Sequence, residues 1–273
     1  VLPGTSNRYL KLRCHRPSSK SPRPERALTE NFPYTMPATT NLVLLRHGES
    51  VSVREKKFSG WDDVPLSDHG LLQAERAAQA LLRSSMVFEQ VYTSYLMRAA
   101  DSLKPIAEAL KLDDHLISRE WRLNERHYGI LQGQYRHDAV MRYGADAIIS
   151  WRRDYRARPP EMPVVHPGHP SKDPKYSHIP IDMLPSTESL EDAAIRIEPW
   201  WEEFARKDLM AGKNVLVVAH TASIRGIKRI VESLNDEQAA AFRIPTASPV
   251  VYELTPELDV VAKYRVDRRI SEV

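Results

Sequence analysis

The sequence predicts an α/β fold in which one doubly wound, mostly parallel sheet carries helices on both faces. Two observations support this prediction. From Asn41 onward, short apolar runs of strand length alternate with longer stretches whose apolar residues recur every three or four positions. The composition agrees, because 42% hydrophobic and 27% charged residues over 273 residues are typical of one large α/β domain or two small ones.

The first half of this pattern begins with the apolar run 42–45, which is typical of a buried parallel strand and ends at Arg46-His47-Gly48. A helix is expected next, because Ser67 can cap a stretch of helical period that ends near Ser84. The elements expected after it are a strand at 89–93, a helix at 96–110 and a short strand at 116–119.

A proline-rich segment divides the second half of the pattern. Residues 159–185 hold eight prolines, so neither a regular helix nor a central strand can run through them. Because long loops of this kind are often functional, we expect this one to cover a functional site. The elements expected after it are a helical stretch at 187–207 interrupted at Pro199, a strand at 214–219, a helix at 222–234 and a last strand at 249–254.

The charge is distributed unevenly along the chain. Residues 1–36 carry seven basic and two acidic side chains, so they have a net charge of +5 and the remainder has −2. A remainder of that charge lacks the basic face of a nucleic-acid-binding protein, and we expect no nucleic-acid partner. The basic segment is rich in Ser and Pro without apolar periodicity, so we expect residues 1–38 to be a disordered extension and residues 39–273 the catalytic domain.

Two interpretations of that extension stay open. It has the Arg-rich, Ser-rich and acid-poor composition of an organelle transit peptide, or it is sequence that precedes a true start at Met36. The rest of the chain points to the cytoplasm, because the single cysteine, Cys14, excludes an intramolecular disulfide framework and a zinc site of several thiolates. No membrane partner is expected either, since the aliphatic runs are far shorter than the roughly 20 residues of a bilayer span.

Chemically active side chains follow three of the predicted strands. In a doubly wound sheet, ligands bind beyond the carboxyl ends of the strands. Arg46 and His47 follow the first strand, His220 follows the strand at 214–219, and Ser94 and Arg98 follow the strand at 89–93. One such histidine is usually structural, but two imidazoles and two guanidiniums at one edge suit a dianionic phosphoryl group.

Longer motifs surround these residues. They are Arg46-His47-Gly48-Glu49-Ser50, Phe58-Ser59-Gly60-Trp61, Thr93-Ser94, Arg98-Ala99, Trp121-Arg122-Leu123-Asn124-Glu125-Arg126-His127-Tyr128-Gly129, Trp151-Arg152-Arg153, Leu184-Pro185-Ser186 and Arg225-Gly226-Ile227. The stretch from Leu123 to Gly129 is far more specific than Arg-His-Gly alone. Together the motifs resemble the cofactor-dependent phosphoglycerate mutases of the histidine phosphatase superfamily over about residues 41–253.

The resemblance implies a phosphoglycerate-mutase-like fold and a role for each motif residue. It implies that His47 accepts a phosphoryl group primed by 2,3-bisphosphoglycerate, with neighbouring guanidiniums keeping its imidazole neutral. Arg46, Arg98 and His220 would hold that group, and Glu125 would act as general acid and base. The substrate-binding residues that it implies are Ser50, Ser59, Gly60, Arg126, Tyr128, Arg136, Arg152, Arg153, Thr221 and Ala222.

The chain departs from the family pattern at four of its positions. Val53 stands where the family usually has Asn, Thr221-Ala222 where it has Gly-Asn, and Arg136 where it has Lys. Two amide donors are therefore missing. Because hydrogen bonds to charged groups contribute about 1.5 to 3 kcal/mol each, their loss corresponds to about two to four decades in rate if nothing replaces them.

Three functions stay open on these grounds. The first is a glycolytic and gluconeogenic isomerase that interconverts 3- and 2-phosphoglycerate with 2,3-bisphosphoglycerate as cofactor and without a metal; Ser50 argues against a dedicated bisphosphoglycerate synthase, where Gly is usual. The second is a histidine phosphatase of the same superfamily. The third is a weakly active or non-catalytic paralogue that acts as an interaction protein. The resemblance implies a phosphorylated sugar acid as ligand and a homodimer or homotetramer as assembly.

Overall fold

The structure, a computed structural model, describes residues 39–266. These residues belong to one compact unit of the chain, Pro37–Val273. The expected basic extension, residues 1–38, lies outside the described residues, so its predicted disorder stays a prediction.

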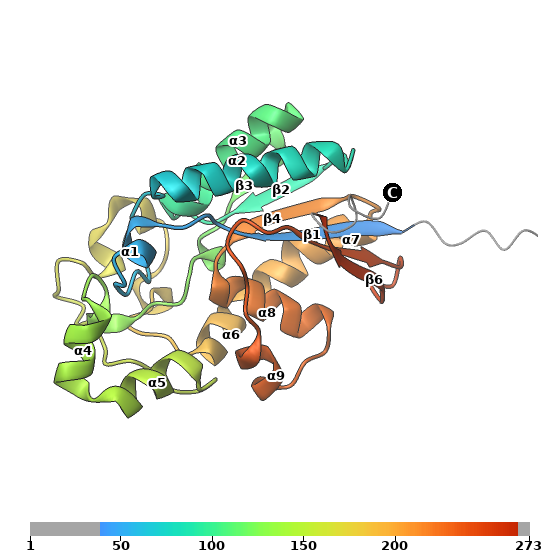
Figure 1. The fold of residues 1–273 in the computed structure, drawn as a ribbon. Coiled ribbons are helices and arrows are strands. Elements are labelled where there is room, and N and C mark those ends of the chain that lie inside the picture. Colours follow the sequence, from blue (N-terminus) through green and yellow to red (C-terminus); the bar gives the residue numbers. More distant parts are fainter. Residues whose placement is uncertain (1–38, 267–273) are drawn as a thin grey trace, which may run out of the picture. The chain divides into compact units, whose positions relative to one another are not determined.

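A six-stranded mixed sheet forms the centre of this unit, with the strand order β3-β2-β4-β1-β5-β6 (Figure 1). Its first four strands in that order pair in parallel, whereas β5 pairs antiparallel with β1 and β6 pairs antiparallel with β5; this confirms the predicted α/β fold with a mostly parallel sheet. The strands are β1 Thr40–Arg46, β2 Gln90–Thr93, β3 Ile117–Arg119, β4 Val215–Ala219, β5 Val250–Leu254 and β6 Val260–Arg265.

The expectation that the strand at 249–254 is the last one is wrong, because β6 pairs with β5 in an antiparallel hairpin. β6 is an edge strand, and its apolar residues Val260 and Val261 are 38% and 47% exposed. Without a buried face it shows no clear hydrophobic period, so the sequence pattern did not reveal it.

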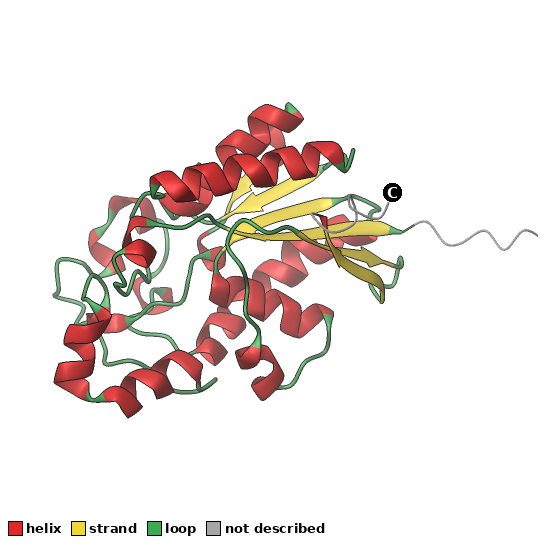
Figure 2. Ribbon diagram, in the orientation of Figure 1, coloured by secondary structure: helices red, strands yellow, loops and turns green. Residues whose placement is uncertain are grey.

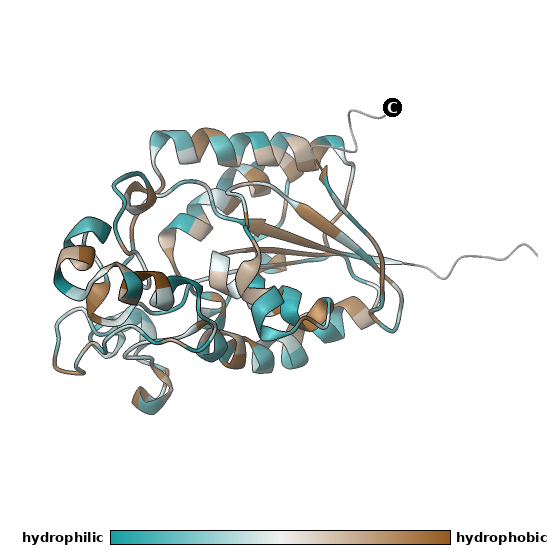
Figure 3. Ribbon diagram, turned by 60° about the horizontal axis from the view of Figure 1, so that its bottom comes forward, coloured by the Kyte–Doolittle hydropathy of each residue, from teal (hydrophilic) through white to brown (hydrophobic). Residues whose placement is uncertain are grey.

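Helices cover both faces of the sheet, as predicted (Figure 1). Alternate residues of β1 show the division: Val43 and Leu45 belong to the cluster formed with α2 and α3, whereas Leu42 and Leu44 pack with α6 and α8. Burial on both sides explains why β1 and β4 are continuously apolar, and Figure 3 shows these hydrophobic strands at the centre. The covering helices are α2 Asp68–Arg83, α3 Met97–Leu110, α6 Leu190–Trp200, α7 Arg206–Met210 and α8 Thr221–Val231.

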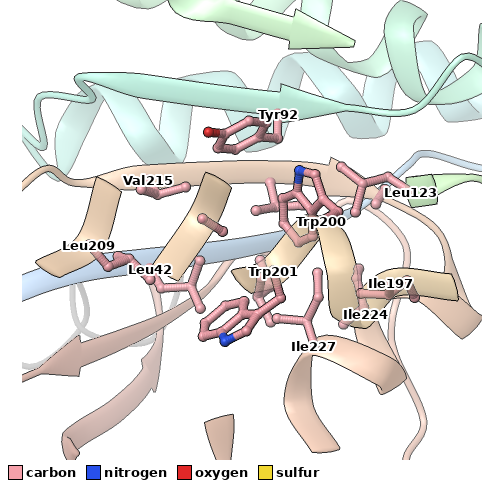
Figure 4. Packing of buried hydrophobic residues seen from close by; sticks show 14 of the residues in the cluster. Leu42, Tyr92, Leu123, Ile197, Trp200, Trp201, Leu209, Val215, Ile224 and Ile227 are labelled. Atoms are coloured by element: carbon pink, nitrogen blue, oxygen red, sulfur yellow. The ribbon is translucent and has the colours of Figure 1, made fainter. Parts of the chain in front are cut away.

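Two tryptophans, one at the end of α6 and one in the turn after it, pack in the apolar layer between the sheet and helices α6 and α8 (Figure 4). Trp200 is fully buried and meets the edge of Tyr92 with 5.2 Å between ring centroids. Trp201 begins a π-helical turn, Trp201–Ala205, that separates α6 from α7. The interruption expected at Pro199 therefore occurs just after it, since Pro199 is accommodated inside α6.

Several short elements escaped the sequence pattern, and most of them lie beyond the carboxyl ends of the parallel strands (Figure 2). The expected helix at 222–234 ends earlier and is followed by a separate helix. The additional helices are α1 Val51–Arg54, α4 Arg136–Tyr143, α5 Ala145–Arg153 and α9 Asp236–Ala241. The 3-10 helices are Asp114–Leu116, Trp121–Leu123, Gly129–Leu131, Pro170–Lys172, Pro174–Tyr176 and Ile181–Met183, and the last three are the only helical turns in the proline-rich loop.

The turn that follows β1 lies directly on the first turn of α2. Ser67 caps α2 as predicted, because its Oγ accepts a hydrogen bond from the N–H of Gly70 at 3.1 Å. A Cβ atom on Gly70 would lie 2.0 Å from the carbonyl oxygen of Glu49, and one on Gly48 would lie 2.3 Å from that of Gly70. Positions 48 and 70 must both be glycine for the two backbone segments to lie this close. Their contact fixes the turn that carries His47.

We expect Gly70→Ala to destabilise the protein, because the added Cβ meets backbone rather than a movable side chain. Overpacking of this kind costs about 1 to 3 kcal/mol of unfolding free energy. The matched control is Gln79→Ala on the exposed side of α2, which should change stability by less than about 0.5 kcal/mol. Urea unfolding measures both, and an unchanged midpoint for Gly70→Ala would contradict the contact.

Candidate active site

A cavity of about 680 Å³ opens at the carboxyl ends of β1 and β4. Arg46 and His47 reach it from the end of β1, and Thr221 reaches it from the first turn of α8. This is the edge at which the sequence predicted a ligand site. The other residues that line it are Glu49, Val53, Lys57, Phe58, Ser59, Gly60, Arg98, Glu125, Arg126, Tyr128, Arg136, Arg152, Leu190, Arg225, Arg243, Ile244, Pro245 and Thr246.

His47 is held as a neutral imidazole with one defined tautomer. Its Nδ1 lies 2.6 Å from the carbonyl oxygen of Gly48, and because a carbonyl can only accept, Nδ1 carries the proton and Nε2 has the free lone pair. The side chain is 3% exposed. Burial, and then the charges of Arg98 and Arg46, hold the pKa of His47 well below its ordinary value. The result is a nucleophilic nitrogen at neutral pH.

His220 lies beside His47, with 4.9 Å between the ring centroids. It joins β4 to α8, and its Nε2 lies 2.7 Å from the Oγ of Ser94. Its Nδ1 is buried and has no hydrogen-bond partner among the described residues. Burial, followed by the charge of Arg98, holds the pKa of His220 well below its ordinary value. A ligand oxygen next to His47 could use the unpaired nitrogen.

Two arginines complete the group around His47. The guanidinium of Arg98 is 1% exposed and donates to the carbonyl oxygens of Gly60 at 2.7 Å and Asp62 at 2.9 Å. Burial lowers the pKa of Arg98 to about 10, so it stays a cation at neutral pH. Arg46 donates from Nη1 to the carbonyl oxygen of Ile244 at 2.8 Å, and its Nε is buried without an acceptor. Two imidazoles and two guanidiniums thus lie together at the edge where the sequence predicted them, although His220 itself does not line the cavity.

The carboxylate of Glu125 is bound to the first turn of α8. Its Oε2 accepts from the N–H of Thr221 at 3.1 Å, and its Oε1 accepts from the N–H groups of Ala222 at 3.1 Å and Arg126 at 2.9 Å. The positive end of the helix dipole adds to these bonds. Two positions at which the chain departs from the family pattern therefore serve Glu125 through backbone groups that any residue other than proline supplies.

The cavity collects seven of the ten residues that the resemblance assigned to substrate binding. They are Ser59, Gly60, Arg126, Tyr128, Arg136, Arg152 and Thr221. Three do not line it. Ser50 is buried and caps α1 by accepting from the N–H of Val53 at 3.3 Å. The side chain of Ala222 packs into an apolar cluster with Leu190. Arg153 is exposed at the end of α5, and it points away from the cavity that Arg152 lines because successive helical residues point about 100° apart.

Several lining residues were not singled out from the sequence. Arg225 lies in a quoted motif that had no role assigned to it, whereas no sequence signal marked Lys57 or Arg243. They bring the lining to eight cationic side chains against the carboxylates of Glu49 and Glu125. Within the described part of the chain, Arg46 Nε, Arg126 Nη1 and Arg136 Nε are buried without an acceptor. Unpaired buried donors are costly, so this cavity fits a ligand with more than one anionic group, as 2,3-bisphosphoglycerate has.

The proline-rich loop does not cover the cavity, because none of residues 159–185 lines it. The loop packs instead on an aromatic cluster, in which Tyr176 contacts Trp61 with 5.0 Å between ring centroids. The hydroxyl of Tyr176 accepts from Asn124 Nδ2 at 2.9 Å. The expectation of a lid is therefore not met, and the loop supports the segment that carries Glu125.

Residues 39–266 contain no group of three or more His, Cys, Asp or Glu side chains that could hold a metal ion. None of their helices combines the length and the apolar character that crossing a membrane requires.

Comparison with known proteins places the chain among phosphoryl-transfer enzymes. The sequence model of the histidine phosphatase superfamily (branch 1) matches residues 42–167 and 166–267. The 2,3-bisphosphoglycerate-dependent phosphoglycerate mutase of Borreliella burgdorferi (strain ZS7) is 40% identical over 223 residues, which cover 82% of this chain and 90% of that protein. The enzyme of the same name from Elusimicrobium minutum is 37% identical over the same shares.

Solved structures confirm the fold. A mycobacterial glucosyl-3-phosphoglycerate phosphatase in complex with VO3 is 24% identical, with a TM-score of 0.61 over 78% of this chain and 92% of that chain. A structure titled Mycobacterial hydrolase 1 is 23% identical, with a TM-score of 0.62 over 83% of this chain and 95% of that chain. At these identities the likeness supports the fold rather than the substrate.

Buried neutral histidines make the stability depend on pH. His127 is fully buried, its Nδ1 accepts from the N–H of Gly129 at 3.0 Å, and burial lowers its pKa to about 3. In the unfolded chain a histidine titrates near 6.5, so below that pH the unfolded state binds more protons and the folded state loses stability until the pH reaches about 3. We expect His127→Asn, which keeps an acceptor for Gly129, to flatten this dependence.

The size of the effect follows from the two pKa values. At pH 5 a single such histidine costs about 2 kcal/mol of unfolding free energy relative to pH 7. Urea unfolding at several pH values between 5 and 7 measures it for both proteins. Parallel curves for the wild type and His127→Asn would contradict a neutral His127.

Proposed function

The chain belongs to the histidine phosphatase superfamily, and from this premise we propose that it is a phosphoglycerate mutase. It interconverts 3-phosphoglycerate and 2-phosphoglycerate through a phosphohistidine at His47. The observation that carries the proposal is the set of further cations that line the cavity together with His47, among them Arg126, Arg136 and Arg152. A phosphatase needs a phosphoryl pocket and an acid, whereas a mutase must also hold the sugar acid while it gives up one phosphoryl group and accepts another.

The proposed transfer uses the groups around His47 in defined roles. In the first transfer, the P–N bond of a phosphohistidine at His47 breaks as the free hydroxyl of the substrate forms a P–O bond, and the Glu125 carboxylate takes the proton of that hydroxyl. In the second transfer, Nε2 of His47 attacks the other phosphoryl group, so that a P–N bond forms as that P–O ester bond breaks, and Glu125 returns the proton to the departing sugar oxygen. Arg46, Arg98 and the unpaired nitrogen of His220 stabilise the charge on the phosphoryl oxygens.

The far side of the cavity is suited to the carboxylate and a second phosphate. Arg126 lies over the ring of Tyr128 at 4.6 Å and donates from Nη2 to the carbonyl oxygen of Trp151 at 2.6 Å. This fixes the guanidinium while its Nη1 stays without an acceptor. When bound, 2,3-bisphosphoglycerate supplies the phosphoryl group that primes His47. Because the relatives from Borreliella burgdorferi and Elusimicrobium minutum are 2,3-bisphosphoglycerate-dependent mutases by name, we infer that this cofactor serves the present chain too.

A phosphatase remains the second candidate. Val53 lines the cavity where the family pattern has an amide, so the grip on the sugar acid is weaker than the family pattern would give. Similar folds also occur in phosphatases. The interaction-protein alternative has less support, because His47, Arg98 and Glu125 are all placed for chemistry. The homodimer or homotetramer and the cytoplasmic location stay predictions.

Incubation with 2,3-bisphosphoglycerate should give an acid-labile phosphoryl adduct on His47. We expect this because Nε2 of His47 carries no proton and shares the cavity with the guanidiniums of Arg46 and Arg98. Mass spectrometry under acid-free handling measures the adduct, and His47→Asn should abolish it, whereas substitution of the exposed His115 by Asn should not. An adduct on another residue, or none, would refute the role of His47.

A coupled assay on the same preparation separates the two candidate functions. With the cofactor present, a mutase converts 3-phosphoglycerate to 2-phosphoglycerate and releases little inorganic phosphate. Release of phosphate without isomerisation would favour the phosphatase.

We expect Val53→Asn to raise the mutase kcat/KM, because it adds an amide donor to a cavity built for anions. One hydrogen bond to a charged group contributes about 1.5 to 3 kcal/mol, and so about 10-fold or more. Phosphohistidine formation should change much less, since Arg46 and Arg98 already hold the transferred group. Val53→Ala is the control that removes the same methyl groups without adding the amide. Equal kinetics for the two variants would show that the amide has no target here.

A further inference from the structure

The loop that carries Glu125 has almost no regular structure, although it is buried beside the site. Between the 3-10 helix Trp121–Leu123 and that at Gly129–Leu131, its peptide groups cannot pair in a sheet or a helix. Buried peptide groups without partners are costly. Side chains from distant parts of the chain supply the missing partners, and one of them serves most of the loop.

Arg196 of α6 supplies the donors for three of these carbonyl groups. Its Nη1 donates to the carbonyl oxygen of Arg122 at 2.5 Å. Nη1 and Nη2 each lie 3.3 Å from that of Asn124, and Nη2 donates to that of Glu125 at 3.2 Å. The carbonyl oxygen between them, that of Leu123, accepts from Ser223 Oγ at 2.7 Å. Four successive carbonyl groups are thus bound by Arg196 and Ser223, and that of Glu125 also accepts from Trp61 Nε1 at 2.6 Å.

Glu188 completes this arrangement from the other side of the guanidinium. It forms a bidentate ion pair with Arg196, in which Arg196 Nε donates to Glu188 Oε1 at 2.6 Å and Arg196 Nη2 donates to Glu188 Oε2 at 2.9 Å. The two side chains are only 7% and 4% exposed. Oε2 of Glu188 also accepts from the N–H of His127 at 2.8 Å. The pair therefore binds the backbone on both sides of the Glu125 side chain.

We propose that Arg196, paired with Glu188, is a positioning residue that sets where the Glu125 carboxyl group delivers its proton. The carboxylate must meet both the first N–H groups of α8 and the ester oxygen of the substrate, and the backbone of Glu125 determines whether it reaches them. The role of the donated proton rests on the proposed function. The placement of the carboxylate does not.

A leaving-group test distinguishes this role from a general contribution to folding. When His47 takes a phosphoryl group from 2,3-bisphosphoglycerate, the departing oxygen of the sugar acid needs a proton from Glu125. When it takes one from para-nitrophenyl phosphate, the phenolate leaves as a stable anion and needs none. A misplaced Glu125 slows the first reaction only, whereas a damaged phosphoryl pocket slows both.

The experiment compares phosphorylation of His47 by the two donors under rapid quench. The variants are Arg196→Gln, Arg196→Lys and Ser223→Ala, with Glu125→Gln as reference. The matched control is Arg158→Gln. Arg158 is exposed, and like Arg196 it forms a bidentate ion pair, in this case with Asp192 of α6. We expect Arg196→Gln to slow transfer from bisphosphoglycerate about 10- to 100-fold and transfer from the aryl phosphate by less than about 3-fold.

The milder variants keep the test decisive if Arg196→Gln does not fold. Arg196→Lys keeps the charge and cannot span the same acceptors, and Ser223→Ala removes one carbonyl partner, so both should show the same selectivity to a smaller degree. Arg158→Gln should show none. Equal slowing with both donors, or no slowing with either, would overturn the proposal.

A second readout does not depend on activity. The amide NMR signals of Thr221 and Ala222 should shift in Arg196→Gln, because the Glu125 carboxylate moves away from these N–H groups. We expect a similar shift in Glu125→Gln. Unmoved signals in a folded variant would overturn the positioning role even if the wild type proved to be a phosphatase. Conversely, a wild type without mutase turnover whose amide signals respond as expected would refute the proposed function alone.

Discussion

The contact between the Glu125 carboxylate and the first N–H groups of α8 joins two parts of the chain that are far apart in the sequence. β4 and α8 place the N–H groups, the irregular loop after β3 supplies the carboxylate, and His220 lies at the junction because it is the residue between β4 and α8. Neither the loop nor the helix end would be satisfied without the other. Glu125, His220 and the first turn of α8 are consequently fixed relative to one another by backbone geometry.

The site also depends on withholding water from its charges. His47 and His220 are neutral because they are buried, and Arg98 stays charged while buried because backbone carbonyl oxygens of Gly60 and Asp62 take the place of water. Such an arrangement is stable only if the surrounding core is rigid. The apolar layers on both sides of β1 and β4, closed by Trp200 on one side and by α2 and α3 on the other, provide that rigidity.

Elements with a strong local signal were predictable from the sequence. β1 and β4 are apolar throughout because both faces are covered, and α2 has a serine cap and a regular apolar period. The ends of those elements carry the phosphoryl pocket, so it was predictable as well. β6 could not be predicted, because an exposed edge strand has no buried face.

The rest of the site depends on contacts that only the fold creates. Arg243 reaches the cavity from the segment after α9, and that segment is held there by Arg46 through a carbonyl oxygen, which leaves no trace in the sequence. Arg196 lies in a helix whose pattern is ordinary, and its function appears only with its carbonyl partners. Arg153 and Ala222 are neighbours of cavity residues in sequence, but a step of one residue along a helix turns the side chain away. The excess of cations around the cavity acts at a greater distance than any of these contacts. It raises the local concentration of phosphorylated anions before they touch the protein, and so speeds their association. Dissolved salt shortens the range of that attraction to about 8 Å at physiological ionic strength. Capture of an anionic ligand therefore varies with the ionic strength, whereas the buried hydrogen bonds of Glu125 are screened much less.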